Sequence, residues 1–182
     1  MASLIPAAGS TGSGSLTLQG PSTSSTQTVT IPDATGTMMV SGNMPAFRAY
    51  AGSNVVISSS TWTKVSLNTK SFDTNSNFDA TTNYRFTPTV AGYYQINATA
   101  NGQTSGTAPT RLVAQIYKNG AAYSYGTDNA VSGTYSSYVS DIIYMNGSTD
   151  YIELYVYITA TTPTVNSGSS SVYMSGSLVR AA

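Results

Sequence analysis

The side chains of this chain that could do acid–base or metal chemistry are almost all carboxylates. The 182 residues include no histidine and no cysteine, so the usual general base and the thiolate nucleophile are absent. The carboxylates stand apart, without the paired spacing that acid–base catalysis needs. They are Asp33, Asp73, Asp79, Asp128, Asp141, Asp150 and Glu153. We therefore predict that the protein is not an enzyme.

Calcium binding is the other chemistry that carboxylates could supply, and Asp128, Asp141, Asp150 and Glu153 are the candidates. Calcium takes about six to eight oxygen ligands, and the chain has no D-x-D-x-D-G loop that would bring them together. We predict no metal and no cofactor, and interpret these residues as solubilising and turn-forming groups.

Tyrosine is the most distinctive residue type, with fourteen tyrosines against four phenylalanines. A phenol buries a large apolar area but keeps a hydroxyl that needs a partner or water, which suits interfaces. For Tyr93, Tyr151, Tyr155 and Tyr157 we favour packing between subunits. Ordinary half-buried sheet surface and contact with an external ligand stay open as alternatives.

The segment 119–138 is rich in Tyr, Ser, Gly and Asn, the composition of adaptable binding loops. Four tyrosines of this segment could contact a glycan: Tyr123, Tyr125, Tyr135 and Tyr138. Because connecting segments are polar by default, we prefer an exposed loop or edge strand for this segment.

The charge balance argues against two classes of partner. The chain has seven basic and seven acidic residues, so we expect no nucleic acid and no anionic membrane as partner. No apolar run approaches the roughly 20 residues needed to span a bilayer. The N-terminal sequence lacks the basic region of a secretory signal, so we expect synthesis and use without that export route.

The elements that must position these residues are β-strands. From Met44 onward the chain alternates apolar and polar residues between Gly, Asn, Ser and Pro turns, without helical periodicity. Expected strands cover 46–51, 54–57, 61–67, 83–88, 92–102, 110–120, 135–147, 150–160 and 170–180. This spacing predicts an all-β sandwich or jelly roll over residues 44–182.

Two strands have clearly different faces. In 150–160 the aliphatic side chains at positions 152, 154, 156, 158 and 160 form the core face, and Tyr151, Glu153, Tyr155 and Tyr157 point away. In 92–102, Tyr94 and Ile96 belong to the core, so the adjacent Tyr93 must face outward.

Residues 1–43 contain one charged residue, Asp33, and too little apolar content for a core. We interpret them as an extended, β-rich attachment arm. Its two apolar pieces are the expected attachment points: Leu16, Leu18, Val29, Ile31, Met38, Met39 and Val40.

Several ordered motifs in residues 45–180 resemble the complement globular-head domain, a member of the tumour-necrosis-factor-like jelly-roll superfamily. Phe86-Thr-Pro-Thr-Val-Ala-Gly92-Tyr-Tyr94-Gln-Ile96 resembles its signature, with Ile96 in place of the usual final Phe. Tyr173-Met-Ser175-Gly-Ser-Leu178 resembles its closing strand, which lies close to the trimer centre. The resemblance implies a ten-stranded jelly roll and a homotrimer, with Tyr173, Ser175 and Leu178 near the subunit contact.

The arm resembles the short β modules that precede terminal domains of bacteriophage tail-fibre and other virion proteins. Together the two resemblances imply a virion-surface protein made in the host cytoplasm. The leading hypothesis is a homotrimeric capsid decoration or head-fibre (cement) protein, with the major capsid protein or a fibre base as its partner. The alternatives are the receptor-binding tip of a short tail fibre and, less favoured, a secreted adhesion module.

Overall fold

The computed structural model describes residues 44–104, 109–129 and 136–182, all of them strands, turns or connecting segments. The predicted attachment residues of the arm and Tyr135 lie outside these ranges. Within the described ranges, no helix is long and apolar enough to cross a membrane. The predicted all-β class is confirmed for this part of the chain.

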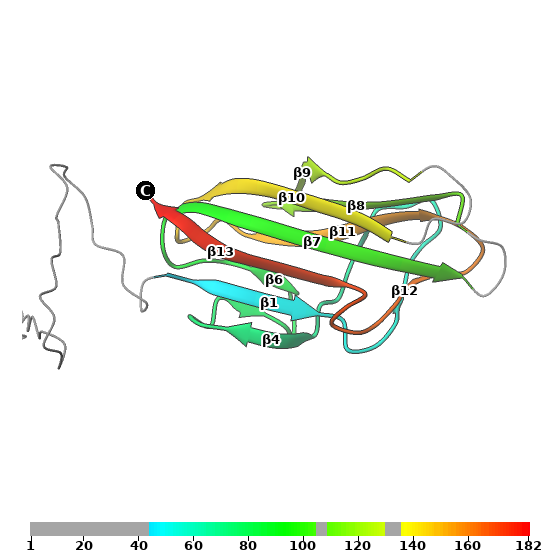
Figure 1. Ribbon diagram of the computed structural model, residues 1–182, viewed down its shortest axis with the longest axis horizontal. Coiled ribbons are helices and arrows are strands. Elements are labelled where there is room, and N and C mark those ends of the chain that lie inside the picture. Colours follow the sequence, from blue (N-terminus) through cyan, green and yellow to red (C-terminus); the bar gives the residue numbers. More distant parts are fainter. Residues whose placement is uncertain (1–43, 105–108, 130–135) are drawn as a thin grey trace, which may run out of the picture. The chain divides into compact units, whose positions relative to one another are not determined.

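The first of two antiparallel sheets has seven strands. Its main part runs in the order β4 (Thr69–Asp73), β1 (Ala46–Tyr50), β13 (Tyr173–Ala181), β7 (Gly92–Thr104) and β10 (Ser136–Met145). The end of β7 also pairs with β12 (Pro163–Val165), which pairs with β2 (Val55–Val56). The first and last strands of the domain, β1 and β13, therefore lie side by side (Figure 1).

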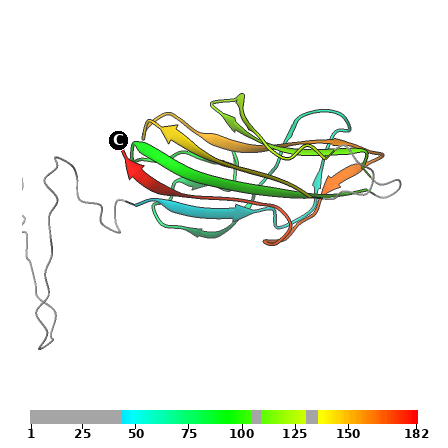
Figure 2. The ribbon, with the colours of Figure 1, turned by 45° about the horizontal axis from the view of Figure 1, so that its top comes forward.

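The second sheet has six strands. β11 (Ile152–Thr159) pairs along its length with β8 (Arg111–Lys118), which pairs with β9 (Ala121–Tyr125). On its other side β11 pairs with β3 (Thr63–Lys64) and β6 (Arg85–Phe86), and β6 pairs with β5 (Phe78–Asp79). The turned view in Figure 2 separates the β1–β13–β7–β10 layer from the layer that contains β8 and β11.

The core fills the space between the two sheets and follows the predicted alternation. Ile152, Leu154, Val156 and Ile158 of β11 are fully buried, as are Tyr94 and Ile96 of β7. Tyr93 is 43% exposed. The predicted register of these two strands is therefore confirmed.

Aromatic rings occupy one part of the core. The Phe47 ring stacks on Phe86 with 4.1 Å between centroids, and the Tyr94 ring meets Phe86 edge-on at 5.6 Å. The Tyr94 hydroxyl donates a 2.7 Å hydrogen bond to the Val90 carbonyl, so this buried phenol is satisfied. Burial raises the pKa of Tyr94 to about 12, because the charged phenolate would be desolvated.

Gly176 shows why the closing strand contains a Ser-Gly-Ser sequence. It pairs with Phe47 of β1 and Ile96 of β7, and its missing side chain would point into the core. A Cβ there would lie 2.5 Å from Ile96 Cδ1 and 3.0 Å from Phe47 Cε1. The two large side chains therefore occupy the space that a side chain at position 176 would need.

The described residues form thirteen strands, whereas the alternation predicted nine and the family resemblance implied ten. Four of the segments expected to be connections are strands: β4, β5, β9 and β12. β4 and β9 are largely exposed, and β5 and β12 span two and three residues. β4 and β9 are edge strands without the alternation from which strands are predicted, whereas β5 and β12 have buried residues but are too short to show a period.

Candidate functional site

The outer face of the seven-stranded sheet carries large apolar side chains that nothing in the described subunit covers. Tyr138, Ile142 and Tyr144 project from β10, which forms the edge of the main part of this sheet, and each is 41–60% exposed. Tyr144 pairs with Tyr93 of β7, and the two rings lie 5.4 Å apart. Apolar groups in such a row are unusual on a surface that faces only water.

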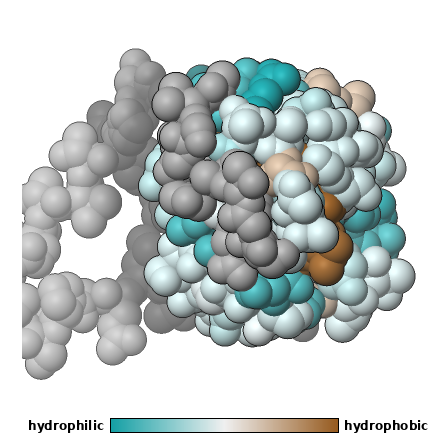
Figure 3. All heavy atoms as spheres, turned by 90° about the vertical axis from the view of Figure 1, so that its right-hand side faces the viewer, coloured by the Kyte–Doolittle hydropathy of each residue, from teal (hydrophilic) through white to brown (hydrophobic). Residues whose placement is uncertain are grey.

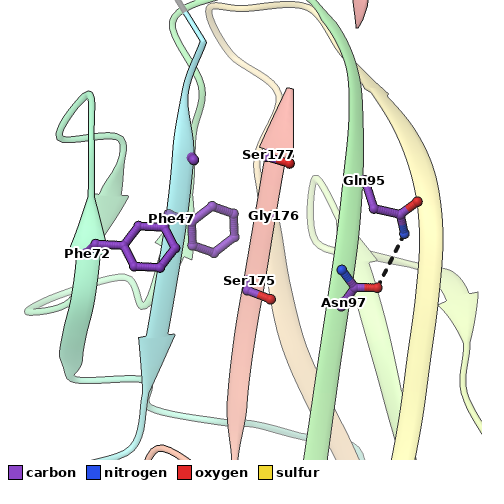
Figure 4. A pocket seen from close by; sticks show the side chains of 8 residues that line it. Phe47, Phe72, Gln95, Asn97, Ser175, Gly176 and Ser177 are labelled. Atoms are coloured by element: carbon purple, nitrogen blue, oxygen red, sulfur yellow. Dashed lines mark hydrogen bonds between the residues drawn. The ribbon is translucent and has the colours of Figure 1, made fainter. Parts of the chain in front are cut away.

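The centre of the same face is polar and hollow. Ser175 and Ser177 of β13 pair with Asn97 and Gln95 of β7, and a depression of about 200 Å³ lies over them. Figure 4 shows the serines and amides on one side of this hollow and the half-exposed ring of Phe72, from β4, on the other. Large side chains at one edge and a hollow toward the other make the face unequal along its width.

Tyr173 lies on the outer side of β13, where Arg48 holds it in place. The Arg48 guanidinium lies 4.2 Å from the centre of the Tyr173 ring and donates to the Ser169 carbonyl and Ser71 Oγ. An arginine fixed by a ring and two oxygen acceptors loses little further freedom on contact with a partner. We name the outer surface of β4, β1, β13, β7 and β10 the seven-strand face.

The residues predicted for subunit packing do not share one surface. Tyr93, Tyr173 and Ser175 belong to the seven-strand face, whereas Tyr155 and Tyr157 of β11, and Tyr151 just before it, belong to the other sheet.

Leu178 differs from the prediction. It is 4% exposed and packs in the core of its own subunit, because it pairs with Tyr94 and points inward with it. Its side chain is therefore a core element, and the Ser-Gly-Ser segment before it is the surface part of this motif.

The outer face of the six-stranded sheet holds an aromatic cluster around Trp62. The centre of the Trp62 ring lies 5.5 Å from that of Tyr157, 6.0 Å from that of Tyr125 and 6.3 Å from that of Tyr117. Tyr117 in turn stacks on Tyr155 at 3.8 Å. These five rings come from β8, β9, β11 and the segment before β3, so only the folded sheet brings them together.

Two ion pairs border this cluster. Arg111 Nε and Nη2 donate to the two Asp128 carboxylate oxygens at 3.0 and 2.7 Å, and Nη2 also donates to the Tyr125 hydroxyl at 2.8 Å. These hydrogen bonds lower the pKa of Asp128 and raise that of Arg111. Lys64 Nζ lies 3.0 Å from Glu153 Oε1.

Glu153 was predicted to point outward, and it does leave the core, but it is only 5% exposed. It lies in β11 between Tyr151 and Tyr155, and opposite Tyr117 of β8. The surrounding large side chains, together with Lys64, explain a buried carboxylate on an outward-facing position.

The tyrosines predicted for ligand contact are separated in the structure. Tyr125 belongs to the Trp62 cluster, whereas the ring of Tyr123 lies beside the Lys118 ammonium, 5.8 Å away. Tyr138 lies on the seven-strand face. Tyrosines that are close together in the sequence of this segment therefore lie on two different sheets.

The carboxylates described next have structural partners, and within residues 44–104, 109–129 and 136–182 no three or more acidic side chains gather as a metal site would require. Asp79 accepts hydrogen bonds from the backbone N–H groups of Thr82, Thr81 and Asn83, which hold its pKa well below its usual range. Asp150 accepts a hydrogen bond from the Asn119 side-chain amide and forms an ion pair with Lys118, and these contacts lower its pKa as well.

The sequence-based site prediction missed Trp62 and Tyr117 of the cluster, and Arg111 and Lys64 at its border. A signal was present, since Trp62 and Lys64 alternate with the core residues Val65 and Leu67 and so belong to an outward face. What the sequence lacked was the information that this face meets the outward faces of β8 and β11.

One end of the sandwich can be seen in Figure 3. In Figure 3 the visible described surface is mostly pale or teal, with one compact brown area.

No family model and no curated protein matches this sequence. Among solved structures the chain is similar to murine APRIL, with a TM-score of 0.54, 11% identity, and coverage of 75% of this chain and 99% of that one. The globular domain of zebrafish complement 1qA gives 0.50 and 17%, covering 76% and 98%. The phage PRD1 vertex protein P5 gives 0.50 and 14%, covering 75% and 97%. The fold is thus a jelly roll of the tumour-necrosis-factor and complement globular-head kind.

Proposed function

We propose that this chain is a non-enzymatic bacteriophage virion protein, a homotrimeric capsid decoration or head-fibre (cement) protein at the virion surface. The observation that carries the proposal is the seven-strand face, whose uncovered apolar row requires a partner surface. The similarity of the fold to the PRD1 vertex protein is consistent with a virion setting.

The uneven seven-strand face is compatible with a closed ring of three subunits. Its projecting residues Tyr138, Ile142 and Tyr144 lie on the β10 edge, whereas the hollow lies toward Phe72. A knob and a hollow on one subunit can fit reciprocally in a twofold pair, or head to tail in a ring that closes when each copy turns by a third of a circle. The trimer implied by the complement-head resemblance satisfies this condition.

The arm, residues 1–43, is the proposed anchor to the virion, through the apolar pieces around Leu16–Leu18 and Val29–Val40, with the major capsid protein or a fibre base as its partner. An arm of this composition cannot offset an ordering cost of roughly 1–2 kcal/mol per residue by itself, so it needs a partner surface. The test is a 44–182 fragment, which should remain a folded trimer but fail to join particles that lack the native protein. Full occupancy of those particles by the fragment would rule out the arm as the anchor.

A second candidate is the receptor-binding tip of a short tail fibre that recognises a host surface glycan or protein. The half-exposed rings of Tyr123 and Tyr125 on β9 favour it, since exposed phenols serve as contact residues. Adsorption competition separates the two functions. Purified trimer should leave infection unaffected if the protein decorates the capsid, and should block infection if it forms the tip.

A further inference from the structure

The Trp62 cluster is explained neither by the main core nor by the seven-strand face. Its rings lie on the opposite side of the sandwich from Tyr93 and Tyr144, and they already contact one another within the subunit. Five aromatic side chains on one sheet surface, bordered by two ion pairs, are more than is needed to cover that sheet.

Part of the cluster is structural. Val113 of β8 points to the outer side of the sheet, where it pairs with Tyr157, yet it is fully buried. Rings above it therefore exclude water from this position. The rings also keep surface that is open to solvent. Tyr125 is 51% exposed, and the other four are half-buried: Trp62, Tyr117, Tyr155 and Tyr157.

The polar groups at the border are paired with one another. The charges of Arg111 and Asp128 cancel, and so do those of Lys64 and Glu153. A surface without net charge offers no advantage to an anionic ligand such as a nucleic acid or a phosphate. The Tyr125 hydroxyl, the Arg111 guanidinium and the Asp128 carboxylate still present donors and acceptors beside the rings.

We propose that the Trp62 cluster is a binding surface for a neutral carbohydrate. A sugar ring has an apolar C–H side that packs against aromatic rings and a hydroxylated edge that bonds carboxylate and guanidinium groups. The cluster supplies both kinds of contact without net charge. A second copy of the chain is a weaker fit, because the uncovered row of apolar side chains lies on the other sheet.

Trp62 is the only tryptophan in the chain, so its fluorescence reports on this surface alone. The full-length protein is titrated with maltohexaose, cellohexaose and chitohexaose, and is also applied to an array of neutral and sulfated glycans. The expected result is saturable binding to at least one neutral glycan, with a shift in Trp62 emission. Saturable binding to no neutral glycan, or to sulfated glycans alone, overturns the proposal.

Tyr125 and Tyr123 form a matched pair of variants. They lie two residues apart on β9 and are 51% and 52% exposed, but of these two only Tyr125 contacts Trp62 in the structure. Tyr125→Ala should weaken binding of the selected glycan about tenfold, measured by calorimetry, and Tyr123→Ala should leave it within twofold. Equal losses in the two variants overturn the proposal.

Trp62→Ala tests the cluster directly, and circular dichroism shows whether the variant is folded. If it is folded, glycan binding should disappear while the mass in light scattering stays unchanged. A change of oligomeric mass in folded Trp62→Ala or Tyr125→Ala would instead assign the surface to contact between copies, and would overturn the proposal. These outcomes are independent of whether the protein decorates a capsid.

Discussion

Ile142 provides the sharpest test of the seven-strand face as the subunit contact. It projects from β10 between two other exposed residues, Ser140 and Tyr144, and is 55% exposed in the single subunit. Complete burial of an aliphatic side chain is worth about 1.5–3 kcal/mol, so covering the exposed half contributes about 1 kcal/mol at one contact. A trimer has three equivalent contacts, so Ile142→Ala should cost about 3 kcal/mol, or about a hundredfold in the association constant.

The same substitution should hardly affect the folding of one subunit, because exposed positions change the free energy of unfolding by roughly 0.5 kcal/mol or less. Val56→Ala is the control, since Val56 of β2 is an aliphatic residue that is 78% exposed and lies away from the apolar row. Sedimentation over a dilution series measures both association constants. Equal association of wild type and Ile142→Ala, or a larger loss in Val56→Ala, would refute the assignment of this face.

Three further predictions concern the core, and a fourth concerns a turn. Tyr94→Ala should lower the free energy of unfolding by about 3–5 kcal/mol because it empties a fully buried site. Tyr93→Ala should lower it far less. Equal losses in thermal melts, with the oligomer intact, would show that the assigned roles are wrong. Since burial raises the pKa of Tyr94 to about 12, the folded state keeps its proton while the unfolded state ionises near pH 10. Tyr94 should therefore contribute a loss of stability of about 1.4 kcal/mol per pH unit between pH 10 and pH 12, and Tyr94→Phe should remove this contribution in denaturant titrations. Gly176→Ala should lower the free energy of unfolding by about 1–3 kcal/mol in chemical denaturation, because its Cβ would overlap Ile96 and Phe47. The neighbouring Ser177→Ala should be nearly neutral. Equal effects of the two substitutions would contradict this packing. The depressed pKa of Asp79 means that its stabilising effect is present above its usual pKa and is lost as the pH falls further, so Asp79→Asn should show a smaller acid-induced loss than wild type.

The alternation along the chain was sufficient to predict the all-β class and the register of the two clearest strands. In a strand, neighbouring side chains must point to opposite faces, so the aliphatic positions of β11 and the Tyr93–Tyr94 pair had one consistent assignment. The Gly-x-Tyr and Ser-Gly-Ser motifs likewise indicated the jelly roll, with which the solved structures agree.

Which sheet each outward face belongs to was decided only by the tertiary structure. Tyr93 and Tyr155 have the same alternation signal, yet one lies on the seven-strand face and the other beside Trp62 on the opposite sheet. Its motif predicted Leu178 to be a contact residue, but Leu178 pairs with Tyr94 and its side chain lies in the core. The period of two determines that a side chain leaves the core, whereas pairing between strands far apart in the chain determines which neighbours it meets.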